Sequence, residues 1–144
     1  MYHKIIIVGN LGRDPEMRYT PDGTPVTSFS VATNRRWTNS DGTPGEETVW
    51  FRITAWRRQA EVAAQYLSKG RQVMVEGRLH PDPATGGPRV YQRQDGSYGA
   101  QYEVTAERII FLGGGNGQAG EPAAPAAEGA AEPAPAGNDE ELPF

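Results

Sequence analysis

The sequence predicts an all-β domain with one helix, in which five strands form a Greek-key barrel. β-rich runs fill most of residues 1–112, and Asp-Gly pairs at 22–23, 41–42 and 95–96 separate several of them. An Asp-Gly pair readily adopts the positive φ angles of tight hairpins, so these runs are expected to be antiparallel strands. One segment, residues 58–69, instead has the periodicity of an amphipathic helix.

The elements follow in a simple order along the chain. Strands are expected at 3–8, 26–34, 48–56, 72–79 and 101–111, with a short extended piece near Arg18-Tyr19-Thr20. Residues 58–69 contain neither Pro nor Gly and place four residues on one helical face: Val62, Ala63, Tyr66 and Leu67. Gly70 follows, and glycine is a frequent left-handed cap at the C-terminal end of a helix. The order is therefore three strands, one helix and two strands.

This order is that of a five-stranded barrel of the oligonucleotide-binding type, the OB-fold, with an all-antiparallel set of strands. A sandwich would need about seven strands. A β-meander with a packed helix is the structural alternative. Residues 80–100 are long enough to project between the last two strands, where this fold places a ligand-gripping loop.

The composition argues against most enzyme classes. The 144 residues include no cysteine and two histidines, which excludes disulfides, thiolate nucleophiles and cysteine-based metal sites. His80 and Asp82 are two possible metal ligands without a third, so no metal, cofactor or catalytic residue is predicted. No apolar run approaches the ~18 residues of a membrane span. A soluble, intracellular protein is expected, with no membrane partner.

Charge and composition divide the chain at residue 112. Residues 1–112 hold all 14 basic residues and 12 of the 18 acidic ones, whereas residues 113–144 hold six acidic residues and no cation. Gly, Ala and Pro make up 21 of these last 32 residues. The sequence therefore predicts a folded domain at 1–112 and a flexible linker at 113–138. A disordered acidic tail then ends in a distinct tip: Asp139, Glu140, Glu141, Leu142, Pro143 and Phe144.

The segment 48–56 carries the most specific signal. Side chains of a strand alternate between its two faces, and here one face is apolar: Val49, Phe51, Ile53 and Ala55. The other face carries Trp50, Arg52, Thr54 and Trp56. Two indoles beside a guanidinium form a poor set to bury, because arginine is rarely buried unpaired. They form a good platform for flat, anionic ligands, although a lone tryptophan is more often part of a core.

Two further aromatic residues lie beside arginines. Trp37 follows Arg35 and Arg36 at a strand end, and strict alternation places it on the face of Phe29 and Val31. Its exposure therefore requires a bulge or a strand end near residue 34. Tyr91 lies between Arg89 and Arg93 in the 80–100 segment, which suits an aromatic contact to a ligand. The alternative is that Tyr91 packs at the base of a hairpin.

These aromatic and cationic residues favour non-covalent binding of a single-stranded nucleic acid. An aromatic ring stacks on the face of any base, and Arg or Lys neutralises phosphate, so neither interaction needs a particular sequence. In a duplex the base faces are already stacked on one another.

The chain resembles the bacterial homotetrameric single-stranded DNA-binding proteins in four stretches. These are Val8-Gly9-Asn10-Leu11-Gly12-Arg13-Asp14-Pro15-Glu16-Met17-Arg18-Tyr19, the segment from Ala60-Glu61-Val62-Ala63 through Tyr66-Leu67-Ser68-Lys69-Gly70, Val75-Glu76-Gly77-Arg78-Leu79, and the acidic Leu-Pro-Phe end. The resemblance covers about residues 3–112 and the last six. It implies a tetramer that protects single strands in replication, recombination and repair, in the cytoplasm and at the nucleoid.

The resemblance also implies roles for individual residues. Bases stack on the residues matching Trp37, Trp50, Trp56 and Tyr91, and the residues matching Lys4, Arg18 and Lys69 meet the backbone. The family often has Phe at the place of Trp56, and Trp at that of Tyr91, which here follows a longer loop. The acidic tip is expected to recruit replication, recombination and repair enzymes through a basic-rimmed apolar pocket.

Two other functions fit the same residues. The first is an RNA-binding barrel, because stacking does not depend on the sugar. The second is a protein-interaction adaptor whose barrel no longer binds nucleic acid.

Overall fold

A computed structural model of the chain describes residues 1–113. They form seven strands and one helix: β1 (Ile5–Leu11), β2 (Glu16–Tyr19), β3 (Pro25–Thr38), β4 (Pro44–Trp56), α1 (Arg58–Tyr66), β5 (Gln72–Leu79), β6 (Arg89–Gln92) and β7 (Tyr98–Leu112). The five long strands, the helix and the short extended piece lie where the sequence predicts them. Beyond Gly113, the predicted linker and acidic tip lie outside the described residues.

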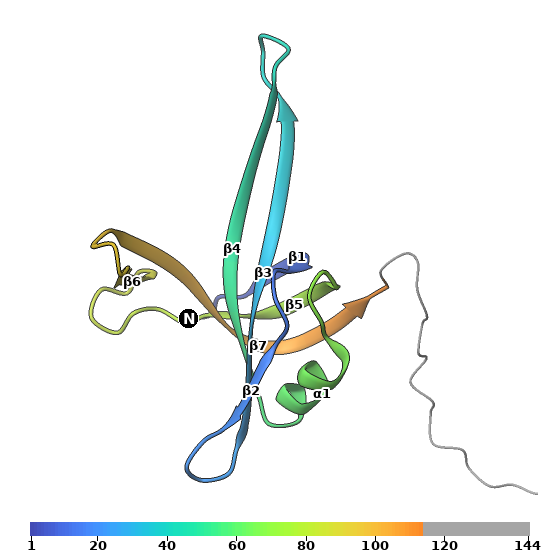
Figure 1. Ribbon diagram of the computed structural model, residues 1–144, viewed down its shortest axis with the longest axis vertical. Coiled ribbons are helices and arrows are strands. Elements are labelled where there is room, and N and C mark those ends of the chain that lie inside the picture. The colour runs from blue at the N-terminus through green and yellow to red at the C-terminus, as the bar shows by residue number, and fades with distance from the viewer. Residues whose placement is uncertain (114–144) are drawn as a thin grey trace, which may run out of the picture.

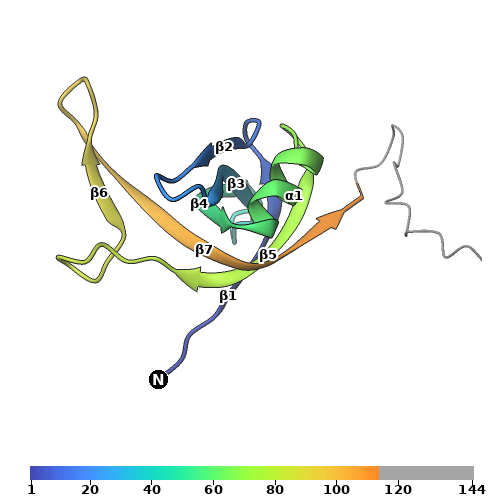
Figure 2. The same ribbon diagram turned by 90° about the horizontal axis from the view of Figure 1, so that it is seen from below.

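Five strands close into a barrel, which confirms the OB-fold (Figures 1 and 2). Around the ring the order is β1, β5, β7, β4 and β3. The ring closes where β1 meets β3, at the pairs Asn10–Ala32 and Leu11–Val31. Gly9 lies beside this junction, where a side chain would collide with the Ala32 carbonyl oxygen. The closure therefore depends on close approach of two backbones at a glycine.

The predicted all-antiparallel arrangement is wrong at one junction. Strands β4 and β7 pair in parallel, from Phe51–Tyr102 to Thr54–Thr105. The other four neighbouring pairs in the ring are antiparallel. A closed ring with an odd number of strands cannot alternate direction all the way round, so at least one pair must be parallel. Closure of the five-stranded barrel therefore requires a parallel pair, and in this protein it is β4–β7.

The core lies inside the barrel and continues under the helix, which lies at one end of it (Figure 2). Inward side chains of the long strands are fully buried, among them Val31, Ile53 and Val75. The buried Thr27 hydroxyl donates a 2.6 Å hydrogen bond to the carbonyl oxygen of Ala60. This bond joins β3 to α1, whose Ala60 and Ala63 are buried against the strands.

The helix ends earlier than predicted, and Gly70 does not cap it. The last helical residue is Tyr66, and Leu67 is already extended, with φ −89° and ψ 147°. The amide of Gly70 donates to the Leu11 carbonyl oxygen at 2.8 Å. Its φ of 84° belongs to the turn that leads into β5. Burial of Leu67 in the core explains the early end, because its side chain reaches the interior once the backbone becomes extended.

The three Asp-Gly pairs build three copies of one turn. Each glycine has a φ of 85°, as the sequence predicts. The aspartate oxygens accept hydrogen bonds from the residue two positions later or from a nearby hydroxyl, which lowers the pKa of Asp22, Asp41 and Asp95. The leading hydroxyl donors are Thr20, Thr43 and Ser97, respectively. These bonds fix the ends of three hairpins.

Two of these hairpins extend beyond the barrel. Strands β3 and β4 continue past the predicted bounds and project as a long two-stranded arm (Figure 1). The predicted loop at 80–100 contains a further hairpin, in which β6 pairs with the first residues of β7. Within residues 1–113, no helix combines the length and the apolar character that crossing a bilayer requires.

Arg57, between β4 and α1, has a backbone conformation that favours glycine. Its φ is 57° and its ψ −128°, and it is the one non-glycine residue with positive φ within residues 1–113. Its amide donates to the Pro25 carbonyl oxygen at 2.9 Å, and its carbonyl oxygen accepts from Ala60 at 3.0 Å. These bonds hold the strained conformation and set the direction of the helix.

We predict that Arg57→Gly increases the free energy of unfolding by about 1 kcal/mol, because removing the β-carbon relieves more strain than the added chain entropy costs. Thermal denaturation measures the change. Arg57→Ala is the control, because alanine keeps the β-carbon and is expected to give no gain. Equal stability of the Gly and Ala variants would contradict the prediction.

Candidate nucleic-acid interface

Strand β4 carries both the core and the candidate interface. Ile53 and Ala55 are buried, whereas Trp50 and Trp56 are 52% and 45% exposed. Arg52, between the two indoles, is also exposed. The predicted division of this strand into an apolar inner face and an open outer face is confirmed, so both indoles are accessible to a ligand.

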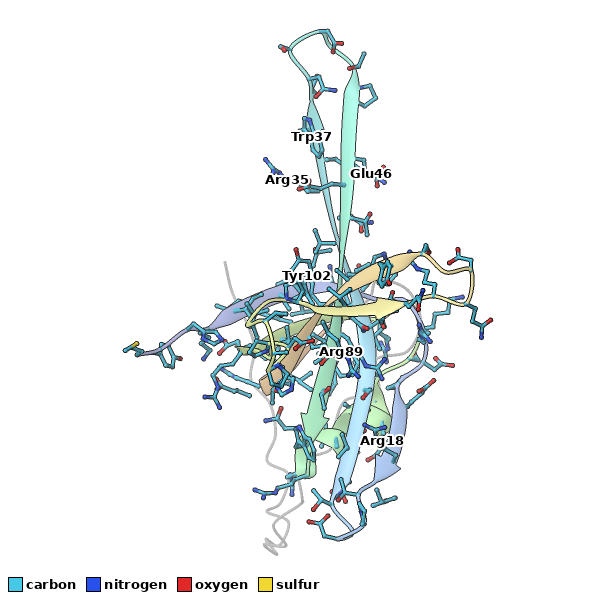
Figure 3. The ribbon with its side chains drawn as sticks, turned by 90° about the vertical axis from the view of Figure 1, so that its left-hand side faces the viewer. Arg18, Arg35, Trp37, Glu46, Arg89 and Tyr102 are labelled. Atoms are coloured by element: carbon cyan, nitrogen blue, oxygen red, sulfur yellow. The ribbon has the colours of Figure 1, made fainter. Side chains whose placement is uncertain are left out.

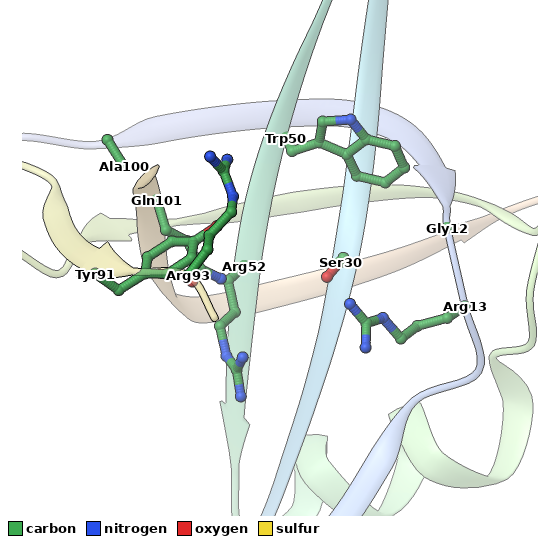
Figure 4. Close-up of a pocket in the computed structure, with 9 residues that line it drawn as sticks. All are labelled: Gly12, Arg13, Ser30, Trp50, Arg52, Tyr91, Arg93, Ala100 and Gln101. Atoms are coloured by element: carbon green, nitrogen blue, oxygen red, sulfur yellow. The ribbon is translucent and has the colours of Figure 1, made fainter. Parts of the chain in front are cut away.

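Trp50 and Arg52 line an open hollow of about 570 Å³ on the outside of the barrel. Figure 4 shows Trp50 on one side of this hollow and Tyr91 on the other, with arginine side chains between them in this view. The β6–β7 hairpin supplies Tyr91, Arg93 and Gln101, and the segment after β1 supplies Arg13. Residues far apart in the sequence therefore surround one cavity.

Three arginines bring positive charge to the hollow. Among residues 1–113, no Asp or Glu oxygen lies within 4.0 Å of Arg13, Arg52 or Arg93. The Arg93 guanidinium lies 5.8 Å from the centre of the Tyr91 ring and donates to the Tyr98 carbonyl oxygen at 3.2 Å. The hollow thus offers aromatic faces and positive charge together, which suits stacked bases with phosphates.

Trp37 lies on the β3–β4 arm, away from this hollow (Figure 3). Its indole nitrogen donates to Asn39 Oδ1 at 2.8 Å, and the Arg35 guanidinium lies 5.6 Å from its ring centre. The ring is 39% exposed and lines a second open hollow of about 550 Å³ with Arg36, Pro44 and neighbouring residues. This hollow is a separate candidate contact.

The expectation of a bulge or a strand end near residue 34 is wrong, because β3 continues unbroken to Thr38. Pairing between β3 and β4 continues without a register shift from Val26–Trp56 to Thr38–Pro44. Trp37 therefore keeps the face of Phe29 and Val31, as strict alternation requires. It is exposed because the arm has left the barrel, so this face has no core to cover.

Ion pairs hold three of the predicted cations. Arg35 and Arg36 face Glu47 and Glu46 across the arm, at 3.5 and 3.3 Å. Lys4 Nζ lies 2.9 Å from a Glu76 oxygen. Hydrogen bonding within this last pair lowers the pKa of Glu76 and raises the pKa of Lys4. All of these side chains keep some contact with solvent.

The remaining predicted residues lie outside the main hollow. Arg18 on β2 pairs with Val26, which pairs in turn with Trp56, so these residues share a cross-strand row. Lys69 is exposed, and its backbone amide donates to Asp14 at 2.8 Å. The structure brings together Trp50, Arg52 and Tyr91, whereas Trp37, Lys4 and Lys69 do not line the hollow.

The sequence did not single out Arg13, Arg93 or Gln101 as members of the site. Arg93 stands two positions from Tyr91, one residue past the end of β6, and both side chains line the hollow. Arg13 lies between two strands, far from Trp50 in the sequence, and no feature of the sequence indicates that the two side chains meet at one hollow. In residues 1–113, no three His, Asp or Glu side chains gather in the way a metal site requires.

Comparison with known proteins places this geometry in a family. Residues 2–112 match the Single-strand binding protein family, which covers the whole barrel and its hairpins. The chain belongs to this family. A single-stranded DNA-binding protein of Neisseria meningitidis is 43% identical over 118 residues, which cover 82% of this chain and 64% of that protein. Single-stranded DNA-binding protein A of Bacillus subtilis is 40% identical over 124 residues, with 83% and 67% covered.

A solved structure shares the fold. The complex of Plasmodium falciparum SSB with ssDNA superposes with a TM-score of 0.63 at 27% identity, and the match covers 78% of this chain and 97% of that one. The matched part of this chain spans just under two thirds of the Neisseria relative.

Proposed function

We propose that this chain binds single-stranded DNA without strong sequence preference and protects it in replication, recombination and repair. The observation that carries the proposal is the outer hollow, where the exposed Trp50 and Tyr91 rings lie beside three arginines that have no carboxylate partner within residues 1–113. Family membership supports the same ligand. In this proposal the protein acts in the cytoplasm, at the nucleoid, and catalyses no reaction.

The proposed mechanism combines stacking with charge neutralisation. A base lies on the open face of Trp50, and a neighbouring base lies on Tyr91 across the hollow. Arg13, Arg52 and Arg93 receive phosphates between the two rings. Each stacked base contributes about 1–3 kcal/mol. Duplex DNA is a poor ligand, because its base faces are occupied by their neighbours.

Further contacts extend the strand along the domain. Trp56 and Arg18 offer a third ring and a further cation toward the helix end of β4, and Trp37 offers a fourth ring on the arm. Arg35, Arg36 and Lys4 contribute when phosphates displace the carboxylates with which they pair. Lys69 adds an exposed cation near Asp14. We propose all of these as backbone or base contacts.

The first strand favours assembly into a tetramer. Strand β1 pairs with β5 along residues 5–10, but within the described residues its other edge pairs with β3 only at Asn10 and Leu11. Ile6 and Val8 are exposed on this strand. An open edge and an apolar outer face are two distinct contacts, and two contacts are what four copies of one chain need.

The acidic tip recruits partner enzymes in this proposal. Residues 139–144 combine three carboxylates with Leu142 and Phe144. An apolar pocket rimmed by cations on a partner suits this combination. The linker at 113–138 lets the tip reach such enzymes while the barrel holds DNA.

The proposed function predicts that oligo-dT quenches tryptophan fluorescence and that affinity falls as salt rises, because bound phosphates release counterions. Titration at several salt concentrations, with competition by matched RNA, measures both. Preference for RNA would support an RNA-binding barrel, and absence of quenching would support a protein adaptor.

Trp50→Ala and Trp56→Ala are each expected to weaken oligo-dT binding by about 1–3 kcal/mol while leaving the barrel folded. Trp50→Phe, which keeps a ring, is the matched control and should retain most of the affinity. A collapse of thermal stability in the alanine variants would show that the rings belong to the core.

Ile6→Glu combined with Val8→Glu is expected to break the tetramer into smaller species, because charge enters its apolar contact. Light scattering measures the mass. Tyr2→Glu, at an exposed residue before β1, is the control. An unchanged tetramer in the double variant would rule out this face as an interface.

Deletion of residues 139–144 is expected to leave oligo-dT affinity equal or higher, because the removed anions no longer compete for the cations. The same deletion should abolish binding of DNA-processing enzymes, measured with purified helicases and nucleases. Weaker DNA binding in the truncated chain would contradict the proposed role of the tip.

A further inference from the structure

Three of the candidate aromatic rings each cover a glycine. A methyl group built on Gly12 would come within 2.5 Å of the Trp50 ring, and one built on Gly99 within 2.8 Å of the Tyr91 ring. On Gly45 it would lie 2.5 Å from the indole nitrogen of Trp37. Real side chains do not approach so closely, so each ring occupies the space that a side chain at the glycine would take.

Two of these contacts are cross-strand pairs. Trp37 faces Gly45 between β3 and β4, and Tyr91 faces Gly99 between β6 and β7. Glycine inside a strand is unfavourable, because it adds chain entropy and has no side chain to pack. An aromatic ring laid across the glycine offsets this cost by covering its backbone.

The other described glycines have different surroundings. Five of them have positive φ, with no atom within 4 Å of the added methyl group: Gly23, Gly42, Gly70, Gly86 and Gly96. Gly9 and Gly77 approach a backbone carbonyl oxygen. Gly12, Gly45 and Gly99 do not have positive φ angles, and the atoms nearest to their added methyl groups belong to side chains. Backbone conformation therefore does not explain these three glycines.

We infer that Gly12, Gly45 and Gly99 are positioning residues that hold one face of each ring against the backbone and leave the other face for a base. This inference rests on the proposed function. A ring seated in this way stacks on one base from one side. It is also ordered before the ligand arrives, so binding does not have to restrict its rotation.

Trp56 provides a comparison within the same protein. Within residues 1–113, no glycine has the Trp56 ring among its nearest neighbours. Binding through Trp56 should therefore be independent of all three glycines.

The test is a double-mutant cycle on the arm, which lies outside the barrel core. Gly45→Ala is expected to weaken oligo-dT binding at least about three-fold, and by no more than Trp37→Ala does. In the Trp37→Ala background, Gly45→Ala is expected to have no further effect, because it acts only through the ring. Gly99→Ala is also expected to weaken binding, but part of its effect should remain in the Tyr91→Ala background, because the added methyl group lies 3.0 Å from the Arg93 guanidinium as well.

Gly113→Ala is the matched control, because nothing lies within 4 Å of its added methyl group. Emission of the free protein provides a second readout: with Trp50→Phe and Trp56→Phe in place, Gly45→Ala should increase the acrylamide quenching of Trp37.

The outcomes separate the inference from the proposed function. An equal loss of affinity from Gly45→Ala with and without the Trp37 ring would overturn the inference and leave the ring's role intact. The inference would also be overturned if Gly45→Ala kept full affinity and an unchanged acrylamide quenching of Trp37 while Trp37→Ala bound weakly. Full affinity of both Trp37→Ala and Tyr91→Ala would overturn the proposed role of these rings, and the inference for Gly45 and Gly99 with it.

Discussion

The alternation of side chains across a single barrel wall is the constraint on which this protein depends. Strand β4 crosses that wall, so every second residue must face the core and every other one must face solvent. Ile53 and Ala55 contribute to the folding of the domain, whereas Trp50, Arg52 and Trp56 are left free on the outside. One strand thus supplies both stability and the candidate interface, and a one-residue slip would exchange the two faces.

Charge is distributed in a way that matches this division. Cations on the arm and on β5 are paired with carboxylates, while Arg13, Arg52 and Arg93 face the hollow and have no carboxylate partner in the part of the chain that the structure describes. A cation already neutralised by a neighbour gains less from a phosphate than a free cation does. Among the described surfaces, the hollow between Trp50 and Tyr91 is therefore the best candidate for binding phosphate, although the domain as a whole has a small net charge.

Hairpins extend the candidate interface beyond the barrel. The β3–β4 arm carries Trp37 outward, and the β6–β7 hairpin brings Tyr91 and Arg93 to the hollow. Both end in an Asp-Gly turn with the same hydrogen bonds. Rings on such thin ribbons have no core to hold them, and the glycines under Trp37 and Tyr91 provide a support that the barrel cannot.

Local rules explain what the sequence by itself determined. Period-two alternation, the Asp-Gly pairs and the helical periodicity of residues 58–69 were enough for the five strands, the turns, the helix and the open face of β4, because each depends on residues close together in the chain. The meeting of Tyr91 with Trp50, the partners of Arg35 and Lys4, and the entry of Arg13 into the hollow were decided only by the tertiary structure. These contacts join distant segments, and closing an odd-numbered ring also required the parallel β4–β7 pair. Trp37 shows the same limit, because its face followed from alternation but its exposure depended on where the barrel ends.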